Sequence, residues 1–404
     1  MDRRTLLKLM AAASLASGAG CSLAQGRRVI VAGAGIVGAS IAYHLAKAGA
    51  EVTVIDKQGP ASHASRGSFA WINATYAKQP RHYHQLSQQG VSGWHTIAAE
   101  LGIPVRWGGS LEWFSGADRQ EKLARQIAEQ EAWGEDARML SVDDAQAIDP
   151  DIEFADASSV AFSGNDGAVD PVIATNLLLD GAQRLGAQLL APCELIDVML
   201  NEGRVTAVLT SCGRLEADRL VLATGAASDA ADKFARTELP QRTTPGVIAI
   251  TKPTARRMNH IIAAPGVHMH QRVDGRIVIG EQEGAPDTHT ERLQGRPNDF
   301  PSRELALEHA GRMLAIADIF SPGMAADIEI EDVYIGWRPL PLDGHPVLGA
   351  SPNRPDVYLA VMHSGISLAP VVGQLVAHEV TRGESLPGLA PYRPGRNFEH
   401  VKRY

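Results

Sequence analysis

The feature that most constrains the fold is a glycine-rich turn between a short apolar strand and a helix. Residues 28–32 are mostly β-branched and apolar, and residues 36–48 then show helical spacing until a glycine ends it. A second apolar strand follows at residues 52–55. Two parallel strands need a crossover of about a dozen residues. The sequence therefore predicts a right-handed βαβ unit at the start of the fold.

The turn has the pattern and the context of a dinucleotide-binding loop. Its glycines permit a tight turn, the approach of a pyrophosphate and close packing of the helix on the strand. Asp56 ends the second strand, where a carboxylate accepts hydrogen bonds from ribose hydroxyls and disfavours a 2′-phosphate. The predicted dinucleotide-binding residues are Gly33, Gly35, Ile36, Val37, Gly38, Asp56 and Lys57. This motif alone does not distinguish FAD from NAD.

Three later blocks favour FAD. A small polar loop around Ser65 can donate hydrogen bonds to phosphates and flavin edges, and residues 219–224 form a strand apolar on both faces, typical of a buried parallel sheet. Residues 363–368 bring a glycine turn and a helix start, and a helix N-terminus can stabilise negative charge on a reduced flavin. The candidate cofactor residues of these blocks are Ser65, Arg66, Ser68, Thr224, Gly225, Gly365, Ile366 and Ser367.

These blocks, together with Gly336-Trp337-Arg338-Pro339 and residues 343–349, resemble the D-amino-acid oxidase-like family of FAD-dependent oxidoreductases over nearly all of residues 27–390. The resemblance is to its glycine oxidase and D-amino-acid dehydrogenase branch. It implies oxidation of the C–N bond of a small amino acid, with hydride transfer to flavin N5 giving an imine and then a 2-oxo acid. The substrate would be a D-amino acid, glycine or an N-alkyl amino acid.

The resemblance also assigns the catalytic residues. Arg338 becomes the clamp for a substrate carboxylate, a role that suits the two parallel donors of a guanidinium. Asn73 and His363 lie in blocks near the flavin or substrate, as do Trp71 and Tyr76. The alternatives are a structural salt bridge for Arg338 and packing roles for the others. Because no cysteine lies near Arg338, unlike in the sarcosine oxidase branch, non-covalent FAD is expected.

Two other functions stay open. One is an oxidase of an amine or opine with a different anchor, and the other is a flavin-bearing electron-transfer or accessory subunit without a small-molecule substrate. The electron acceptor is either oxygen or a membrane or periplasmic carrier. The net charge of −8 gives no basic surplus for nucleic acid.

The expected fold class is α/β, with a discontinuous Rossmann-like FAD-binding domain and an α+β substrate domain on an antiparallel sheet. The FAD-binding domain is predicted at 27–85, 150–235 and 331–395, and the substrate domain at 86–149 and 236–330. Residues 87–147 are predicted to be mostly helical, with the clearest helix at 120–133. Further helices are predicted at 172–186, 303–317 and 369–381. The other predicted strands are a three-strand meander at 188–224, and 246–251, 268–273, 276–280 and 357–362.

The first residues are predicted to be an export signal. Arg3-Arg4-Thr5-Leu6-Leu7-Lys8 precedes an apolar stretch at 9–19 that is too short to span a bilayer. Residues 1–25 therefore resemble a twin-arginine signal, which predicts a periplasmic protein. A lipid anchor at Cys21 is less favoured because its box lacks the usual leucine. An unstructured N-terminus with chance arginines is the alternative.

No metal site is predicted. His268 and His270 share a face of one predicted strand, but ordinary strand histidines explain them better than a metal without a third ligand, and the same holds for His82 and His84.

A tight turn at Glu202-Gly203 would pair two strands so that Asn201 faces Arg204. In that register Cys193 faces Cys212, and a disulfide between them is the less favoured interpretation against two free thiols.

Overall fold

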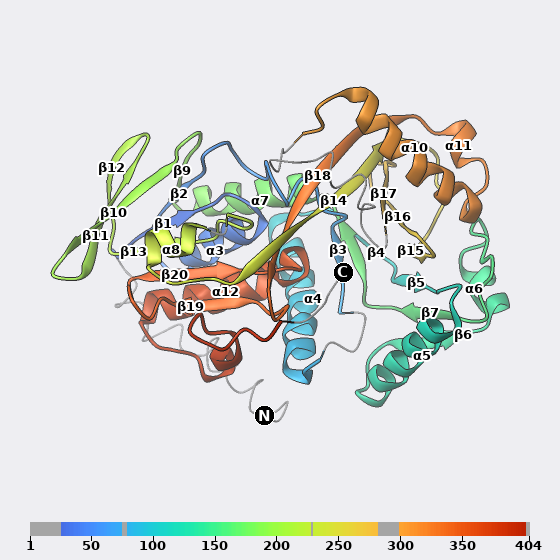
Figure 1. The fold of residues 1–404 in the computed structure, drawn as a ribbon, viewed down its shortest axis with the longest axis horizontal. Helices are drawn as coiled ribbons and strands as arrows, with labels where there is room; N and C mark the ends of the chain where they lie inside the picture. The colour runs from blue at the N-terminus through green and yellow to red at the C-terminus, as the bar shows by residue number, and fades with distance from the viewer. Residues whose placement is uncertain (1–25, 75–78, 228, 282–298, 401–404) are drawn as a thin grey trace.

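A six-stranded sheet forms the centre of one half of the molecule (Figure 1). This computed structural model describes residues 26–74, 79–227, 229–281 and 299–400, so the predicted export signal with Cys21, and Tyr76, lie outside the described residues. The strand order is β19-β20-β13-β1-β2-β9, and every neighbouring pair is parallel except β19 with β20. The strands are β1 (Arg28–Ala32), β2 (Glu51–Ile55), β9 (Gln188–Leu190), β13 (Arg219–Leu222), β19 (Val347–Ala350) and β20 (Val357–Val361).

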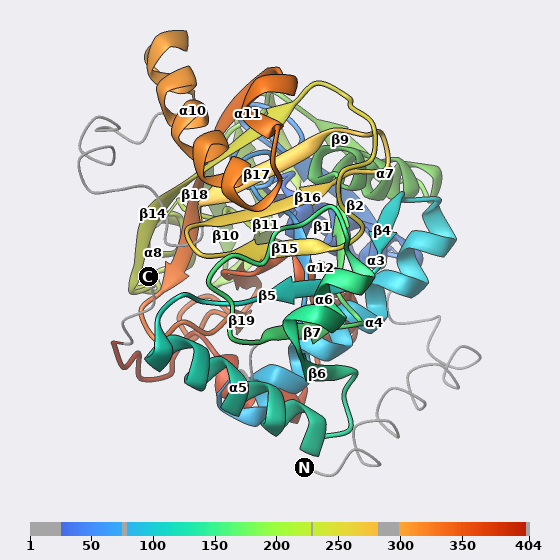
Figure 2. The ribbon, with the colours of Figure 1, turned by 90° about the vertical axis from the view of Figure 1, so that its right-hand side faces the viewer.

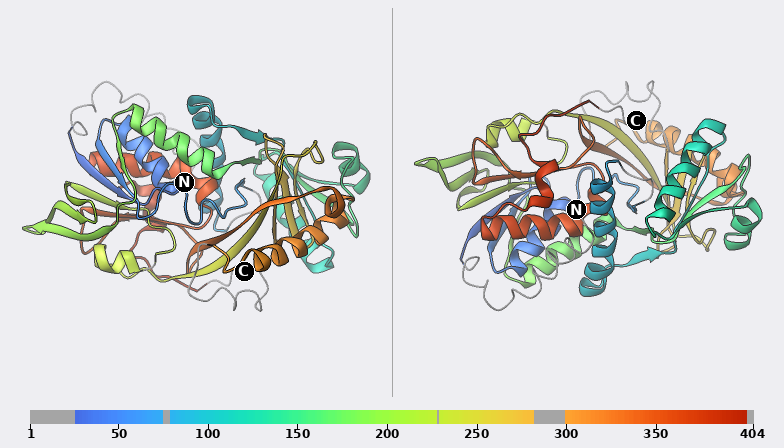
Figure 3. Two further views of the ribbon diagram at one scale, coloured as in Figure 1. Left: turned by 90° about the horizontal axis from the view of Figure 1, so that it is seen from above. Right: turned by 90° about the horizontal axis from the view of Figure 1, so that it is seen from below.

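Alternate side chains of this sheet enter two different cores. Val29 and Val31 of β1 face the helices α3 (Ile36–Lys47), α7 (Pro171–Arg184) and α12 (Gly365–Arg382), which lie together on one face (Figure 3). Ile30 and Ala32 face a small sheet and α8 (Asp229–Ala235) on the other side. The small sheet consists of β10 (Leu195–Asn201), β11 (Arg204–Thr210) and β12 (Gly213–Glu216), which protrude at the left of Figure 1.

The predicted βαβ unit is confirmed as β1, α3 and β2. Its first strand matches the predicted bounds, and Gly49, at a φ of +86°, follows the end of the helix. The helix predicted at 172–186 is α7, whose N-cap Asp170 accepts hydrogen bonds from two of the first amide groups at 2.9 and 3.0 Å. The central position of β13 confirms the strand predicted to be buried on both faces.

An eight-stranded sheet, called the platform below, forms the other half of the molecule. Its order is β18-β14-β17-β16-β15-β5-β7-β6, and all its neighbours are antiparallel except β15 with β5. The strands are β5 (Ser110–Glu112), β6 (Ala137–Leu140), β7 (Val160–Ser163), β14 (Gln241–Thr251), β15 (Ile261–Ala264), β16 (Val267–Gln271), β17 (Ile277–Glu281) and β18 (Ile330–Pro341). The predicted antiparallel platform is thus confirmed.

Helices cover one side and one end of the platform. In Figure 2, α10 (Arg303–Phe320) and α11 (Met324–Asp327) lie at one margin, and α5 (Ala117–Ala132) and α6 (Val142–Ile148) near the other. The long strands β14 and β18 run side by side between the two halves of the molecule (Figure 1). A third small sheet contains β3 (Trp71–Ile72), β8 (Gly167–Val169) and β4 (Val105–Trp107), and a 3-10 helix covers Pro387–Tyr392.

The structure corrects three element predictions. The stretch at 87–147 holds helices α4 (Arg81–Leu101), α5 and α6, but also the strands β4, β5 and β6, which are too short and too polar to show a pattern of their own. The predicted meander at 188–224 is divided, because β9 and β13 join the six-stranded sheet. Helix α12 begins at Gly365, not at residue 369, because Ser364 takes the left-handed conformation just before it.

The predicted α/β fold class is confirmed, while the division into two domains stays a prediction. Helix α4 packs in the same hydrophobic core as α3 and α12, and Trp94 Nε1 donates a hydrogen bond to Ile366 O at 2.7 Å. Within the described residues, the helices are too short or too polar for any of them to cross a bilayer.

Candidate active site

The glycine turn is packed so tightly that side chains cannot enter it. Gly33 has a φ of +111°, and a Cβ there would lie 2.3 Å from the carbonyl oxygen of Ala223, at the end of β13. A Cβ on Gly38 would lie 1.9 Å from the carbonyl oxygen of Gly33. Thr224 and Gly225 follow Ala223, so the structure brings these two predicted cofactor residues beside the turn. Gly225 also has a positive φ, of +57°.

Asp56 ties the turn to the end of β2. Its carboxylate accepts hydrogen bonds from the amides of Ala34, Gln58 and Gly59, each at 2.9 Å. The acid predicted to bind ribose therefore also fixes the backbone on which a dinucleotide would lie. Lys57 is exposed beside it.

The polar loop after β2 caps the same helix. Ser65 Oγ accepts a hydrogen bond from Ile36 N, the first amide of α3, at 3.0 Å. Ser68 Oγ accepts one from Ala70 N at 3.0 Å. Arg66 forms an ion pair with Asp299 at 2.7 Å, and its guanidinium lies 4.7 Å from the ring centre of Tyr334 on β18. Of the three predicted cofactor residues in this loop, only Ser65 hydrogen-bonds the glycine-turn helix directly.

Two glycines bring this loop onto β18. A Cβ on Gly67 would lie 2.4 Å from Gly336 N, and one on Gly336 would lie 2.5 Å from Gly67 O. The two backbones therefore touch, which neither position would allow with a larger residue. The contact holds the chain that leads into Trp71 and Asn73 against β18, two residues before Arg338.

Arg338 lies half-buried on one face of the platform. It pairs with Thr244 of β14, so the two side chains share a face. A Cβ on Gly246 would lie 2.8 Å from Arg338 Nη2, so the guanidinium lies over this glycine, and Nη1 donates to Pro245 O at 3.4 Å. The guanidinium can occupy this position only because Gly246 has no side chain.

The two faces of the platform differ in polarity. Val247 and Ala249 of β14 point into the apolar core beneath α10. The opposite face carries Arg338 and Thr244, and its register also places His268 of β16 there, through Gly280 and Ile248. A face with buried polar groups needs partners for them, which favours this face as the substrate side.

Aromatic rings line the platform face beside these groups. The ring centroids of Phe69 and His268 lie 5.5 Å apart, those of Trp71 and His268 5.7 Å, and those of Phe69 and Trp71 6.4 Å. Trp71 Nε1 donates to Asp166 Oδ2 at 2.9 Å, which fixes the indole. Phe69, Trp71 and His268 are called the aromatic wall below.

Burial keeps the platform histidines neutral. It lowers the pKa of His268 to about 4, with a smaller contribution from the charge of Arg338, and lowers the pKa of His270 to about 3. Because Phe69 O can only accept, His270 Nε2 carries the proton in their 2.8 Å hydrogen bond. The two histidines share a face as predicted, and the described residues contain no group of three that could hold a metal.

These shifts predict acid sensitivity. In the unfolded chain His270 takes up a proton near pH 6.5, whereas in the fold it stays neutral down to about pH 3, so acid favours unfolding. Its contribution to stability is complete above pH 6.5 and is lost as the pH falls from there. We expect the free energy of unfolding, measured in urea, to fall less between pH 7 and 5 in His270→Gln than in the unmodified protein. Equal falls would contradict a neutral buried imidazole.

The N-terminus of α12 meets both the glycine turn and the aromatic wall. A Cβ on Gly365 would lie 3.1 Å from Val37 Cγ2, so this turn packs against the start of α3. Ser367 Oγ accepts a hydrogen bond from Asn73 N at 3.0 Å and donates one to Trp71 O at 3.1 Å. His363 is half-buried, with Nδ1 3.1 Å from Ser364 Oγ. Predicted residues from both ends of the chain therefore meet here.

Ser367 is expected to position this junction. Ser367→Ala leaves the amide of Asn73 and the carbonyl of Trp71 without this partner, which costs about 1–3 kcal/mol of stability. We expect a lower kcat with the flavin still bound, measured by steady-state assay and flavin absorbance. Thr381→Val, in the same helix, is the control, because Thr381 Oγ1 bonds only within α12. A kcat equal to that of the control would contradict this role.

The residues present fit an FAD dinucleotide. The N-cap of α3 is Gly35, which offers no side chain to the helix start and leaves room for a phosphate. Among the described residues, the hydroxyls of Thr243 and Thr244 and the amide of Gln241 are buried without hydrogen-bond partners. All three lie on the half of β14 that pairs with residues 338–341. Such groups cost stability unless a ligand or water satisfies them.

Sequence reasoning missed several of these residues. Phe69, Thr244 and Asp166 were not proposed for the site, and His268 was considered only as a metal ligand. The one available signal was that Phe69 lies within the block from Ser65 to Asn73. Placing Thr244 and His268 needed the register of β14 with β18 and of β16 with β17.

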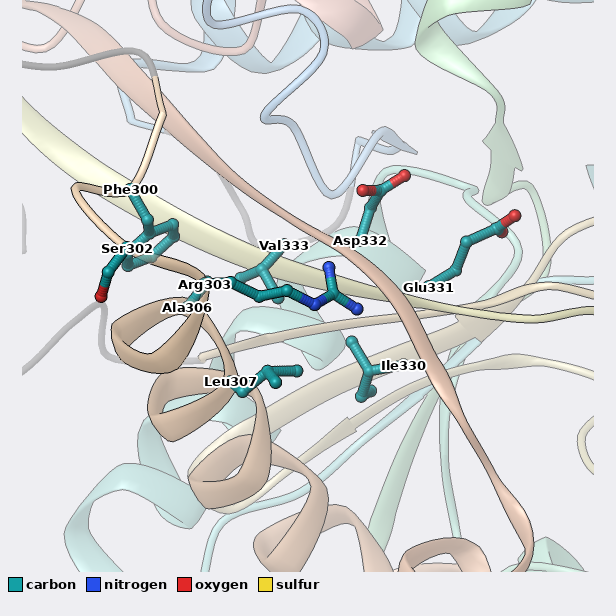
Figure 4. A pocket seen from close by; sticks show the side chains of 9 residues that line it. All are labelled: Phe300, Ser302, Arg303, Ala306, Leu307, Ile330, Glu331, Asp332 and Val333. Carbon is teal, nitrogen blue, oxygen red and sulfur yellow. The ribbon is translucent and has the colours of Figure 1, made fainter.

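A separate pocket lies on the outside of the platform. It has a volume of about 160 Å³ and lies between α10 and β18 (Figure 4). Its lining residues are Phe300, Ser302, Arg303, Ala306, Leu307, Ile330, Glu331, Asp332 and Val333. It uses the opposite end of β18 from Arg338 and none of the predicted site residues. We therefore do not assign it to the active site.

Comparisons with known proteins relate this chain to FAD-dependent oxidoreductases. A family model described as FAD dependent oxidoreductase (DAO) matches residues 28–379. Glycine oxidase of Bacillus licheniformis is 25% identical over 360 residues, covering 86% of this chain and 91% of that protein. A component of the opine oxidase of Agrobacterium tumefaciens (strain Ach5) is 25% identical over 372 residues, covering 88% and 93%. The crystal structure of glycine oxidase from Geobacillus kaustophilus superimposes with a TM-score of 0.82 at 21% identity, covering 92% of this chain and all of that one.

Proposed function

Since this chain belongs to the DAO family of FAD-dependent oxidoreductases, we propose that it oxidises the C–N bond of a small amino acid. The cofactor is FAD. The substrate class is a D-amino acid, glycine or an N-alkyl amino acid, and the product is an imine that water converts to a 2-oxo acid. The observation that carries the proposal is Arg338, half-buried on the polar face of the platform next to the aromatic wall.

The chain supplies binding and orientation. When bound, FAD would supply flavin N5 as the hydride acceptor. Arg338 can hold the substrate carboxylate with two charge-assisted hydrogen bonds, which fixes the position of the α-carbon. The aromatic wall would form one side of that region, since the His268 ring lies beside Phe69 and Trp71. His268 is neutral above about pH 4, so Arg338 is the positive charge that the carboxylate meets.

Anaerobic mixing with a panel of amino acids tests the proposal. We expect one class of amino acid to bleach the flavin absorbance of the purified holoenzyme, with formation of the matching 2-oxo acid. Readmission of air then separates the acceptors, because an oxidase recovers its absorbance within seconds to minutes and a dehydrogenase needs an added carrier. If no amino acid or amine bleaches the flavin, the protein is an electron-transfer or accessory subunit instead.

A second candidate is oxidation of an opine or amine with a different anchor. The similarity to a component of an opine oxidase favours keeping it. N-carboxyalkyl amino acids and simple amines therefore belong in the same panel. Reduction by amines that carry no carboxylate would support this candidate and remove Arg338 from substrate binding.

We place the reaction in the periplasm, on the basis of the twin-arginine pattern in residues 1–25. Cell fractionation with a C-terminal tag tests this location, and recovery of the unmodified protein only from the cytoplasm would exclude export. The matched variant has Arg3 and Arg4 replaced by lysine, and we expect it to stay in the cytoplasm.

A further inference from the structure

Two cysteines far from the substrate site lie side by side at the start of the small sheet. Cys193 is buried between β9 and β10, and Cys212 is exposed in the turn between β11 and β12. Ser211 N donates to Glu194 O at 2.9 Å, and Glu194 N donates to Ser211 Oγ at 2.9 Å. Glu194 and Ser211 thus extend the antiparallel pairing of β10 with β11. The two cysteines are the next opposed pair, where side chains come close.

The hydrogen bonds of the two cysteines converge. Cys193 Sγ donates to Thr210 Oγ1 at 3.4 Å, and the same oxygen accepts from Cys212 N at 3.1 Å. Cys212 Sγ donates at 3.4 Å to the carbonyl of Pro192, the residue just before Cys193. A hydrogen bond with the Cys193 thiol raises the pKa of Cys212. Each sulfur therefore lies against the backbone or the thiol of the other.

We propose that Cys193 and Cys212 are a redox-active pair that closes to a disulfide in oxidising surroundings and braces the half of the molecule that contains the six-stranded sheet. Both thiols are free in the structure, which is then the reduced form. This inference does not depend on the proposed substrate. The sequence alone favours two free thiols, whereas the structure brings the two cysteines together.

The chemistry is thiol–disulfide exchange with a small-molecule or protein disulfide as oxidant. The exposed Cys212 loses its proton and attacks the oxidant, forming a mixed disulfide and releasing one thiol. Cys193 then loses its proton and attacks Cys212 Sγ, which forms the Cys193–Cys212 bond and releases the second thiol. The pair loses two protons and two electrons, and the oxidant gains them. Exchange should accelerate as the pH rises towards the pKa of Cys212.

The Cys193–Cys212 disulfide would act on the predicted cofactor site through Asp56. Cys193 N donates to Asp56 O at 2.6 Å, and Asp56 N donates to Leu190 O at 3.2 Å. Cys193 itself and the chain just before it are therefore bonded to the residue that holds the glycine turn. A bond from Cys193 to the turn at Cys212 closes the loop of residues 193–212 and restrains this segment in the unfolded chain as well.

Alkylation mass spectrometry tests the pairing. The purified holoenzyme is equilibrated with oxidised glutathione, alkylated without reduction and mapped by peptides, so that Cys21 is counted separately. We expect Cys193 and Cys212 to remain unalkylated and their two peptides to be joined. The joined pair should be lighter by two hydrogen atoms than the two reduced peptides together. After dithiothreitol, both cysteines should be alkylated. Alkylation of both cysteines before reduction, or glutathione held on Cys212 alone, would overturn the proposal.

The temperature of flavin release tests the brace. We expect the oxidised holoenzyme to release its fluorescent flavin several degrees above the reduced one, because closing a loop of this length stabilises the fold. Cys212→Ser is the control, since the exposed position tolerates serine and its release temperature should not respond to dithiothreitol. Equal release temperatures for oxidised and reduced protein, with the pair shown to be joined, would overturn the bracing role.

Discussion

Arg338→Ala lowers kcat/KM for the amino acid that reduces the flavin by about 10²- to 10³-fold, mostly through a higher KM. The reason is the loss of two charge-assisted hydrogen bonds to the carboxylate, on a face where the guanidinium lies over Gly246. Flavin binding is expected to stay intact, because Arg338 lies on β18 of the platform and not in the glycine turn. Stopped-flow reduction over a range of substrate concentrations measures the effect.

Two further variants separate charge from geometry. Arg338→Lys keeps the charge but loses the fork, so it should recover only part of the affinity. Arg276→Ala removes an arginine that lies just before β17 of the platform and is paired with Glu331 at 2.6 Å, and should leave kcat/KM within about twofold. An unchanged KM in Arg338→Ala, with flavin bound, would rule out the carboxylate clamp and favour a structural role for this arginine.

Gly38→Ala abolishes stable flavin binding and destabilises the fold by about 3 kcal/mol or more. A Cβ at this position would lie 1.9 Å from Gly33 O, a backbone atom that cannot move without opening the turn. Helix α3 would then have to move away from β1, and the pyrophosphate would lose its position at the helix N-terminus. Flavin content after purification and urea denaturation of the remaining protein measure the two effects.

Gly311→Ala is the matched control. Gly311 lies in helix α10, where a Cβ would meet no atom within 4 Å, so alanine should be neutral or slightly stabilising. If Gly38→Ala kept its flavin as firmly as this control, the assignment of the glycine turn to the pyrophosphate would be wrong. If Gly38→Ala lost stability but kept its flavin, that result would also contradict the assignment of the glycine turn to the pyrophosphate.

The start of the half that contains the six-stranded sheet was predictable because its signals are local. The glycine turn, the β-branched strands and the helix between them depend on neighbouring residues, and their predicted bounds agree with β1, α3 and β2 to within one or two residues. The match of the family model confirms the resemblance that the remote blocks indicated. The apolar run at 219–224 predicted even its central place in the sheet.

Short strands were not predictable in the same way. Residues 110–112 contain one apolar residue between a serine and a glutamate, and only pairing with β15 and β7 makes them a strand. The register that puts Thr244 opposite Arg338 likewise depends on contacts between distant segments. Residue types therefore indicated the chemistry of the site. The contacts within the aromatic wall and the two hydrogen bonds of the Ser367 hydroxyl could be found only from the fold.

The order of strands in the six-stranded sheet has a consequence for synthesis. β1 pairs with β13 at Val29 and Arg219, and β13 pairs with β20 at Leu220 and Val357. Contacts between segments so far apart in the chain slow folding, because long loops must close before the contacts can form. On the ribosome the glycine turn emerges early, but the strand and helix that complete its surroundings, β20 and α12, emerge more than 300 residues later. Capture of FAD is therefore expected only after β20 and α12 have been made, and a chain truncated before residue 357 should not retain it.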